Sequence, residues 1–556
     1  MALKANLLLD TFGIHLSDEE RSAIIYLETG KEPETVSRQE FFRSTQSYGQ
    51  AFVDLGINKG DLLIIAHTQD LESIFLFWGA MLIGAIPSMF PKLTEKLDPE
   101  IYARSMAELV RISDVKAVFS TNDFALRMNS IVDCPVIGSS QLKALAISDA
   151  EVKVDPADID PSQIALLQHS SGTTGLQKGV ALSHRSVLNQ IAHYSKAIGL
   201  NKEDVVVSWL PLYHDMGLIA GFILPIFQGV PLVLMSPFDW IRHPAMLFRA
   251  IHDYRGTLCW LPNFAYNHSA RRIRDRDLEG LSLASMRMFI NCSEPVYDES
   301  HQLFLSRFGD YGLRPDMLAA SYAMAENTFG VTQTAPGVEP EIDVIDRSSL
   351  ENERWARPAD KKNEGALIKV SCGQPIEGTS VRVVDESGST LPDRRVGEIA
   401  IQSDCMLSEY YRRPDLSPFV DGWYMTGDRG YLADGHLYLV GRSKDLIINA
   451  GKNVYPQDIE AIVNDIPGVR PGRAVAFGVF DQKEGTELIA VVAEVTTEDA
   501  QKRQAIIKKI RQDVARRSMI TVTYVKLVGS KWLIKTSSGK IARGANRDKW
   551  LVENNQ

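Results

Sequence analysis

The sequence predicts an α/β protein built on parallel, helix-covered sheets, and three observations favour this class. Apolar, strand-like runs alternate with helical stretches from residue 19 to about residue 290. The 556 residues are too many for one ordinary core, so two or more domains are expected. With 45% hydrophobic and 23% charged residues, the composition is that of a soluble globular protein. Ligands of such sheets bind at the ends of the strands.

The elements follow in chain order. A strand is expected at residues 23–26, then an amphipathic helix opened by Ser37 and a buried strand at residues 62–66. Further strand candidates lie at 117–119, 135–137, 164–167, 205–210, 231–234, 258–260 and 286–290. Strands at 381–385 and 397–401 predict a smaller β subdomain. After it, strands at 474–479, 488–495 and 522–528 with a helix at 498–517 predict a small α+β unit.

Two longer apolar runs, at residues 73–90 and 218–235, each contain proline and are only marginally long enough to span a bilayer. Buried helices of a large domain are the better interpretation, so no integral membrane segment is expected. Residues 1–10 hold too brief an apolar run for a secretion signal. The five cysteines are odd in number and form no C-x-x-C pair, which suits a reducing cytoplasm rather than a disulfide framework or a zinc site.

The formal net charge of −10 argues against general nucleic-acid binding, because a basic excess would accompany it. The charge is nevertheless uneven. One late segment is basic and contains Lys502, Arg503, Lys508, Lys509, Arg511, Arg516 and Arg517. A solvated helix face is the simplest interpretation of such a run.

A run of hydroxyls and glycines ending in one lysine follows the strand at residues 164–167, and it reads Ser170-Ser171-Gly172-Thr173-Thr174-Gly175-Leu176-Gln177-Lys178. Glycines let backbone N–H groups turn toward an anion, hydroxyls add donors, and one ammonium supplies charge. The run therefore predicts a phosphate-binding loop. The alternative is a flexible loop that only leads to the helix start at Ser183. A P-loop is disfavoured, because Lys178 precedes a glycine and no hydroxyl follows it.

This string closely resembles the signature of the adenylate-forming (ANL) superfamily, and later motifs resemble its fatty acyl-AMP ligase branch. The resemblance covers nearly the whole chain. It implies that Ser170, Ser171, Gly172, Thr173, Thr174, Gly175 and Lys178 wrap the phosphates of ATP. It also implies a large N-terminal domain over residues 1–441, a hinge at 442–445 and a small, mobile α+β domain over 446–556. No G-x-G-x-x-G or G-x-S-x-G occurs, so a dinucleotide oxidoreductase and an α/β-hydrolase lose ground.

Several motifs follow expected strands and carry one or two polar side chains each. Tyr213-His214-Asp215-Met216 is the first, although His214 alone is typical of an ordinary hydrogen-bonded loop histidine. The resemblance implies that these four residues, with Asn263 and Cys292, line the acyl site, whereas aromatic residues nearby are equally typical of core packing. Cys292 stands where the family usually has Gly or Ala. A nucleophilic role is disfavoured for it, because a buried thiol is normally inert.

The nucleotide and metal residues are implied in the same way. Ser293-Glu294-Pro295 and Ser321-Tyr322-Ala323-Met324 resemble segments that hold the nucleotide. Glu326 is the magnesium candidate, because Mg²⁺ is commonly held by one carboxylate together with substrate phosphates. Asp428 follows a glycine turn, and a carboxylate that accepts two vicinal hydroxyls suits ribose. Arg442 resembles the arginine that contacts ribose and phosphate, and Lys444 resembles the hinge residue.

Lys540 lies in a glycine–serine turn near the end of the chain and resembles the catalytic lysine of the family. An ammonium there would stabilise the negative charge that gathers on the α-phosphate when a carboxylate attacks it. For Lys540 alone, a solvated side chain is the alternative. Residues 337–372 form a polar, charged stretch that resembles the insertion marking fatty acyl-AMP ligases, which hinders domain rotation. A long surface loop is the alternative for that stretch.

The resemblance implies ATP- and Mg²⁺-dependent activation of a fatty acid, or of another carboxylic acid, to acyl-AMP with release of pyrophosphate. The acyl group would then pass to the phosphopantetheine thiol of an acyl carrier protein or of a polyketide or non-ribosomal synthase carrier domain. Coenzyme A is the alternative acceptor. The basic segment at 502–517 is a candidate docking surface for an acidic carrier protein. A binding protein without catalysis is disfavoured by Lys540, and a tRNA ligase by the lack of a basic recognition domain.

Overall fold

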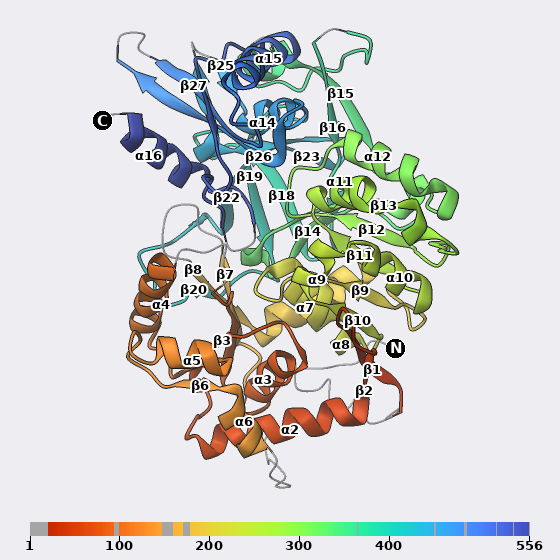
Figure 1. The fold of residues 1–556 in the computed structure, drawn as a ribbon, viewed down its shortest axis with the longest axis vertical. Helices are drawn as coiled ribbons and strands as arrows, with labels where there is room; N and C mark the ends of the chain where they lie inside the picture. The colour runs from red at the N-terminus through yellow and green to blue at the C-terminus, as the bar shows by residue number, and fades with distance from the viewer. Residues whose placement is uncertain are drawn as a thin grey trace.

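The computed structural model describes residues 20–93, 99–146, 159–170, 178–363, 365–449, 452–482, 486–518, 520–536 and 539–554. Two large sheets, each with helices beside it, occupy the lower and middle parts of Figure 1, and the C-terminal elements lie at its upper end. The predicted class, a helix-covered α/β fold, is therefore confirmed.

The first large sheet has seven strands in the order β20-β8-β7-β4-β3-β5-β6. Strands β3 to β7 run parallel, while β8 and β20 are antiparallel at one edge. The strands are β3 (Leu62–Ala66), β4 (Ile86–Met89), β5 (Ala117–Ser120), β6 (Val136–Gly138), β7 (Ile164–Ser170), β8 (Lys178–Ser183) and β20 (Glu409–Tyr410). Parallel pairing of buried apolar strands is what the alternating pattern predicts.

The second large sheet has nine strands in the order β17-β14-β13-β12-β11-β9-β10-β1-β2. Strands β1 and β9 to β13 are parallel to their neighbours in this series. The strands are β1 (Ser22–Leu27), β2 (Glu34–Ser37), β9 (Val206–Ser208), β10 (Leu232–Met235), β11 (Leu258–Leu261), β12 (Met288–Asn291), β13 (Leu318–Ala323), β14 (Gly330–Gln333) and β17 (Gln374–Pro375). The carboxyl ends of the parallel strands β1 and β9 to β13 therefore share one edge of this sheet.

Helices cover both sheets, and two begin where polar caps predict. Ser37 caps α2 in a capping box with Glu40, and the Ser183 hydroxyl accepts a bond from the N–H of Ser186 at the start of α7. The helices of this part are α2 (Arg38–Asp54), α3 (Leu71–Leu82), α4 (Pro99–Ser113), α5 (Asn122–Met128), α6 (Ser139–Ala146), α7 (His184–Ala197), η3 (Met216–Ile223), α8 (Leu224–Gln228), α9 (Pro237–Arg242), α10 (Ala245–Asp253), α11 (Asn263–Arg272) and α12 (Asp298–Phe308).

The two apolar runs at 73–90 and 218–235 each form a helix followed by a strand, α3 with β4, and η3 and α8 with β10. Buried helices were expected in both runs and a strand at 231–234 in the second, so β10 is as predicted and only β4 was missed. Proline and glycine interrupt the helical pattern at both strands. The helices hold the two sheets together, since the rings of Phe77 and Trp78 pack 5.7 and 6.2 Å from that of Phe222. Within the described ranges, no helix combines the length and apolarity that crossing a bilayer requires.

A smaller β sheet follows, as predicted, with the order β18-β19-β22-β21 and β23 paired to β22. Its strands are β18 (Thr379–Val384), β19 (Gly397–Ser403), β21 (Phe419–Val420), β22 (Trp423–Ala433) and β23 (His436–Arg442). The stretch at 337–372 is not an unstructured loop, because it contains the hairpin β15 (Ile342–Asp346) and β16 (Ala366–Val370) with helix α13 (Arg347–Glu353) between them.

The last part of the chain has an apolar core of its own, which includes Ile459, Val491 and Ile510. It consists of β24 (Ile447–Asn449), β25 (Lys452–Val454), α14 (Pro456–Asn464), β26 (Val469–Asp481), β27 (Thr486–Val495), α15 (Ala500–Ser518), β28 (Tyr524–Val528) and α16 (Arg543–Asn554). Arg543 joins α16 to the rest, because its guanidinium pairs with Glu460 at 2.8 Å and with Asp445. A separate core is what a small α+β unit requires.

The 337–372 stretch packs between the β subdomain and this last part. Ile345 and Leu350 share an apolar cluster with Tyr438 and with Tyr455, which directly precedes α14. Lys369 of β16 lies 3.6 Å from the carboxylate of Asp458, and the Asn453 amide donates to the Glu351 carbonyl at 2.8 Å. The stretch therefore contacts the C-terminal part through both apolar and polar groups.

Candidate active site

The hairpin of β7 and β8 presents the residues on either side of the predicted phosphate loop. Ser170 and Lys178 are paired opposite each other at the open end of the hairpin. The other predicted loop residues, Ser171, Gly172, Thr173, Thr174 and Gly175, lie outside the described residues. The Lys178 ammonium lies 4.7 Å from the centre of the Tyr410 ring, a cation–π distance. The hairpin thus places one ammonium at the start of β8.

Tyr410 links this lysine to the predicted metal carboxylate. Its hydroxyl donates to a Glu326 oxygen at 3.0 Å and lies 2.9 Å from the hydroxyl of Tyr424. The main chain reinforces the link, because the N–H of Leu407 donates to the Glu326 carbonyl. Sequence reasoning missed Tyr410, since only the pairing of β20 with β8 brings it to the site and no local motif surrounds it.

Glu326 is half-buried in a short turn, η7 (Ala325–Asn327). Burial raises the pKa of its carboxyl, while the hydrogen bond from Tyr410 and the charge of Lys178 oppose the rise. A single carboxylate is a ligand that Mg²⁺ commonly takes together with substrate phosphates. A magnesium role for Glu326 stays a prediction.

The predicted acyl motif surrounds the start of η3. Asp215 caps this helix by accepting from the N–H of Met216 at 2.8 Å, and the Nδ1 of His214 lies 2.5 Å from an oxygen of the same carboxylate. Burial alone would raise the pKa of Asp215, but His214, together with the charge of Lys540, lowers it. Gly217 is required here, because a Cβ at that position would lie 2.3 Å from the carbonyl oxygen of Pro211. Tyr213 is half-buried on the same loop.

Asn263 is the centre of a buried hydrogen-bond network. Its amide donates to the Ser300 hydroxyl at 3.0 Å, and its oxygen accepts from the amide of Asn291 at 3.1 Å and from the N–H of Tyr297. Asn291 continues the network to His301 at 3.0 Å. The side chain thus positions the loops after β11 and β12, and its place in the lining of the acyl site stays a prediction.

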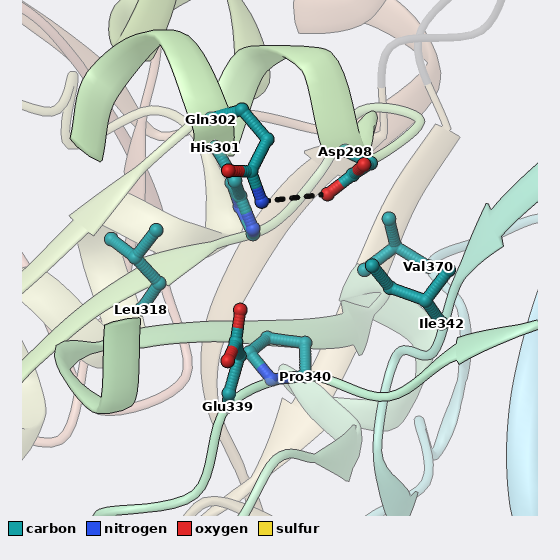
Figure 2. A pocket seen from close by; sticks show the side chains of 8 residues that line it. All are labelled: Asp298, His301, Gln302, Leu318, Glu339, Pro340, Ile342 and Val370. Carbon is teal, nitrogen blue, oxygen red and sulfur yellow. Dashed lines mark hydrogen bonds between the residues drawn. The ribbon is translucent and has the colours of Figure 1, made fainter. Parts of the chain in front are cut away.

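Figure 2 shows a small cavity on the far side of this network, where Asp298, His301 and Gln302 of α12 face Glu339. Its volume is about 10 Å³, which is the space that one water molecule needs. Burial lowers the pKa of His301 to about 4, so the imidazole is neutral at physiological pH. The cavity is too small for a nucleotide or an acyl chain.

The loop after β12 carries Cys292, Ser293, Glu294 and Pro295. Cys292 is fully buried, and burial raises the pKa of its thiol to about 12, so it is a neutral thiol. Ser293 has a φ of +68°, a left-handed conformation that turns the chain sharply. Glu294 then accepts from the N–H of Phe264 at 2.9 Å. The loop is therefore fastened to the start of α11.

The ribose candidate Asp428 is held by two partners. The Tyr322 hydroxyl donates to one of its oxygens at 2.6 Å, and Arg442 donates to the other at 3.1 Å. The Asp428 carboxylate raises the pKa of the already basic Arg442. Ser321, beside Tyr322, instead donates to the Thr332 carbonyl within the sheet. Ala323 and Met324 are half-buried directly after this pair, and Lys444 is exposed in the turn after Arg442.

Lys540 comes from the C-terminal part of the chain and is half-buried. Burial, followed by the charge of Arg442, lowers the pKa of its ammonium, while Asp215 and Glu294 oppose that change. Groups from the acyl motif, the nucleotide loop and the ribose segment thus all act on one lysine. Lys540 thus interacts electrostatically with groups from three distant segments of the chain, Asp215, the 292–294 loop and Arg442.

Two helix-covered sheets followed by a β subdomain and a small α+β unit form the fold of an adenylate-forming enzyme. Residues 17–411 match the model of the AMP-binding enzyme family. The chain belongs to this family. The predicted superfamily and enzyme class are confirmed, and ATP use follows from the membership.

Similar proteins agree with this membership over most of the chain. A medium-chain-fatty-acid–[acyl-carrier-protein] ligase, JamA of Moorena producens, is 31% identical and aligns with 96% of this chain and 92% of its own length. A long-chain-fatty-acid–AMP ligase, FadD26 of Mycobacterium marinum, is 31% identical over 87% of this chain and 86% of its own. A structure from a study of fatty acyl-adenylate ligases of E. coli and L. pneumophila has a TM-score of 0.89 at 25% identity, covering 98% of both chains.

Proposed function

We propose that this enzyme activates a fatty acid with ATP to give acyl-AMP and pyrophosphate, and then transfers the acyl group to the phosphopantetheine thiol of a carrier protein. The observation that carries the proposal is that the charge of Lys540 interacts with the acyl-motif carboxylate Asp215, the loop residue Glu294 and Arg442. Relatives named as fatty-acid–AMP ligases and as a carrier-protein ligase support the substrate class and the acceptor. A cytoplasmic location stays a prediction.

The proposed chemistry assigns one task to each group. The phosphate hairpin with Lys178 binds the β- and γ-phosphates, Asp428 and Arg442 hold the ribose, and Lys540 stabilises charge on the α-phosphate during attack by the acid. Tyr410 keeps Glu326 beside Lys178. Mg²⁺ on Glu326 would neutralise phosphate charge and orient the leaving pyrophosphate. The substrate carboxylate is the nucleophile, so no protein nucleophile is needed.

The domain limits 1–441 and 446–556, with a hinge at Lys444 within 442–445, belong to the same proposal. Lys540 serves adenylation in the present arrangement, and the 337–372 insertion favours that arrangement because it contacts the C-terminal part. Rotation about the hinge would break these contacts and therefore requires free energy. An enzyme held in this way adenylates well and completes thioester formation slowly unless binding of the acceptor offsets the cost of that rotation.

A direct test supplies ATP, Mg²⁺ and a panel of fatty acids with either coenzyme A or a phosphopantetheinylated carrier protein. Pyrophosphate release reports adenylation, and mass spectrometry of the thioester products identifies the acceptor. We expect acyl-AMP in both reactions and acyl thioester mainly on the carrier. Acyl-CoA as the dominant product would favour the alternative acceptor, and absent pyrophosphate release with every acid would contradict adenylation.

The insertion interface predicts a pH effect on stability. Burial raises the pKa of Glu351 from its ordinary 4.5 to about 7, and Arg347 opposes the rise. Since the folded state holds this proton more tightly than the unfolded state, the Glu351 contribution to stability falls as pH rises from about 4.5 through about 7. Glu351→Gln removes this ionisation, so its melting temperature relative to the natural protein should increase between pH 5 and pH 8.

Thermal unfolding at several pH values measures this difference. Glu353→Gln is the matched control, because Glu353 lies on the same helix with half of its side chain exposed. A difference between Glu351→Gln and the natural protein that stays constant with pH would contradict the raised pKa of Glu351.

The exposed face of α15 is the proposed docking surface for an acidic carrier protein. Lys508, Lys509 and Arg511 are exposed on this helix. Charge reversal of the three to Glu should lower the rate of carrier acylation several-fold at low ionic strength and leave acyl-AMP formation unchanged, because steering by surface charge is screened by salt. Lys361→Glu with Lys362→Glu, on the exposed insertion, is the control. Unchanged carrier acylation would exclude this surface.

A further inference from the structure

Three neighbouring parallel strands place aromatic side chains at one edge of the second sheet. In the sheet order β11-β9-β10, Trp209 directly follows β9, Trp240 lies in α9 after β10, and Phe264 lies in the first turn of α11 after β11. All three therefore come from the carboxyl ends of adjacent strands, where α/β sheets bind their ligands. The cluster is built by topology, since its members are distant in sequence.

The cluster is tightly packed. The rings of Trp209 and Trp240 stack with centres 3.7 Å apart and planes within 8°. The ring centre of Phe264 lies 6.1 Å from that of Trp209 and 6.0 Å from that of Trp240, edge to face in both pairs. The ring centre of His268 lies 5.3 Å from that of Trp240. Trp209 and Trp240 are 4% and 0% exposed, whereas Phe264 is 39% exposed. Phe264 is thus the member that separates the two indoles from solvent.

The cluster lies next to the proposed adenylation centre. The N–H of Phe264 donates to Glu294 at 2.9 Å, and Glu294 is one of the carboxylates that act on Lys540. Trp209 also begins the loop that carries Asp215, whose pKa the charge of Lys540 lowers. An acid held with its carboxylate near Lys540 would have the aromatic cluster within reach of its chain.

The two stacked indoles carry an unusual polar feature. Within the described part of the chain, neither the Nε1–H of Trp209 nor that of Trp240 has a hydrogen-bond partner. An indole is a donor only, so nothing but an acceptor can satisfy it. A buried donor without a partner costs about 1–3 kcal/mol, so an acceptor that reaches either N–H would be bound favourably. The third indole of this sheet, Trp260, does have its partner, the Tyr194 hydroxyl at 2.9 Å.

We propose that the acid this enzyme activates carries an oxygen on its chain or ring, and that Trp209 and Trp240 select it by donating hydrogen bonds to that oxygen. The inference rests on the proposed function and narrows its substrate class. A plain alkyl chain would leave both buried N–H groups without an acceptor, whereas a hydroxyl, oxo or phenol oxygen would satisfy at least one. The aromatic rings around it supply the apolar contact for the rest of the acyl group.

The experiment compares matched pairs of acids on the full-length protein. Straight-chain fatty acids are set against hydroxy and oxo acids of the same length, and phenylalkanoic acids against their hydroxyphenyl counterparts, so that the two arms separate a chain oxygen from a ring oxygen. Pyrophosphate release gives kcat/KM for each acid, and calorimetry gives its affinity. Trp209→Phe and Trp240→Phe keep an aromatic ring but remove the N–H, and Trp355→Phe, in the insertion, is the control.

In the natural protein we expect a preference of roughly 5- to 150-fold for the oxygenated acid of at least one pair, the range that one buried hydrogen bond supplies. One or both of the Phe variants at 209 and 240 should lose most of that preference, while Trp355→Phe should keep it. Equal use of the members of every pair, or a preference that survives both variants, would overturn the inference. If no acid releases pyrophosphate, the proposed function fails, and the affinities of the same pairs still decide the inference.

Discussion

Lys540→Ala should lower the rate of acyl-AMP formation by at least roughly 10²–10³-fold, the cost of removing one preorganised donor from a transition state. The expected loss is this large because Lys540 is the group from the C-terminal part on which Asp215, Glu294 and Arg442 all act. Pyrophosphate release in the presence of ATP, Mg²⁺ and an accepted acid measures the rate. Substrate affinity should change much less, since the ammonium is needed mainly when charge develops on the α-phosphate.

The control for this variant is Lys535→Ala, because Lys535 precedes the same turn and its ammonium donates to the Gly472 carbonyl. It should keep most of the activity. The pH profile is a second test: burial and Arg442 lower the pKa of Lys540, so activity should fall on the alkaline side before pH 10.5 as the ammonium loses its proton. Normal pyrophosphate release by Lys540→Ala, with an unchanged melting temperature, would contradict the catalytic role.

Glu326→Gln should raise the Mg²⁺ concentration needed for half-maximal adenylation by about 10- to 100-fold. Removing a residue that only supports a metal ligand already lowers metal affinity by about this factor. Glu326→Gln goes further, because a neutral amide replaces the proposed carboxylate ligand itself. The amide can still accept the hydrogen bond from Tyr410, so the local fold should persist. Rates measured across a series of Mg²⁺ concentrations provide the test.

Tyr410→Phe distinguishes the hydrogen bond that holds Glu326 in place from the proposed binding of Mg²⁺ by the Glu326 carboxylate. It removes the hydroxyl that holds Glu326 but leaves the carboxylate and the aromatic face beside Lys178. We expect a smaller rise in the Mg²⁺ requirement than for Glu326→Gln. A Mg²⁺ dependence that is the same in Glu326→Gln and in the natural protein would exclude Glu326 as the metal ligand.

Much of the fold could be predicted from local patterns. The strand at Leu62–Ala66 and the helix starts after Ser37 and Ser183 are as expected, because buried apolar runs and polar caps are short-range signals. Strand β8 was missed, since its residues follow the glycine-rich loop and lead directly into α7. The fold inside 337–372 was missed as well, because its hairpin is stabilised by contacts with distant residues.

The residues of the candidate site also fall into two groups, those that the sequence predicts and those that only the structure shows. Residues within motifs, such as Asp428 and Lys540, could be nominated from the sequence, and their roles stay predictions. Tyr410 and the stacked pair of Trp209 and Trp240 could not, because each depends on neighbours far along the chain. Asn263 was nominated for a substrate contact, whereas its side chain forms a buried network with Ser300 and Asn291.

The sequence by itself determined the helix-covered α/β class, the superfamily and the order of the motifs, because these depend on residue type and spacing along the chain. Only the tertiary structure decided which charges meet. The charges of Lys540 and Asp215 interact although 325 positions separate them, and two indole N–H groups are buried in one cluster because β9 and β10 are neighbours in a sheet. Electrostatics and desolvation depend on distance in space, and a linear pattern does not contain that distance.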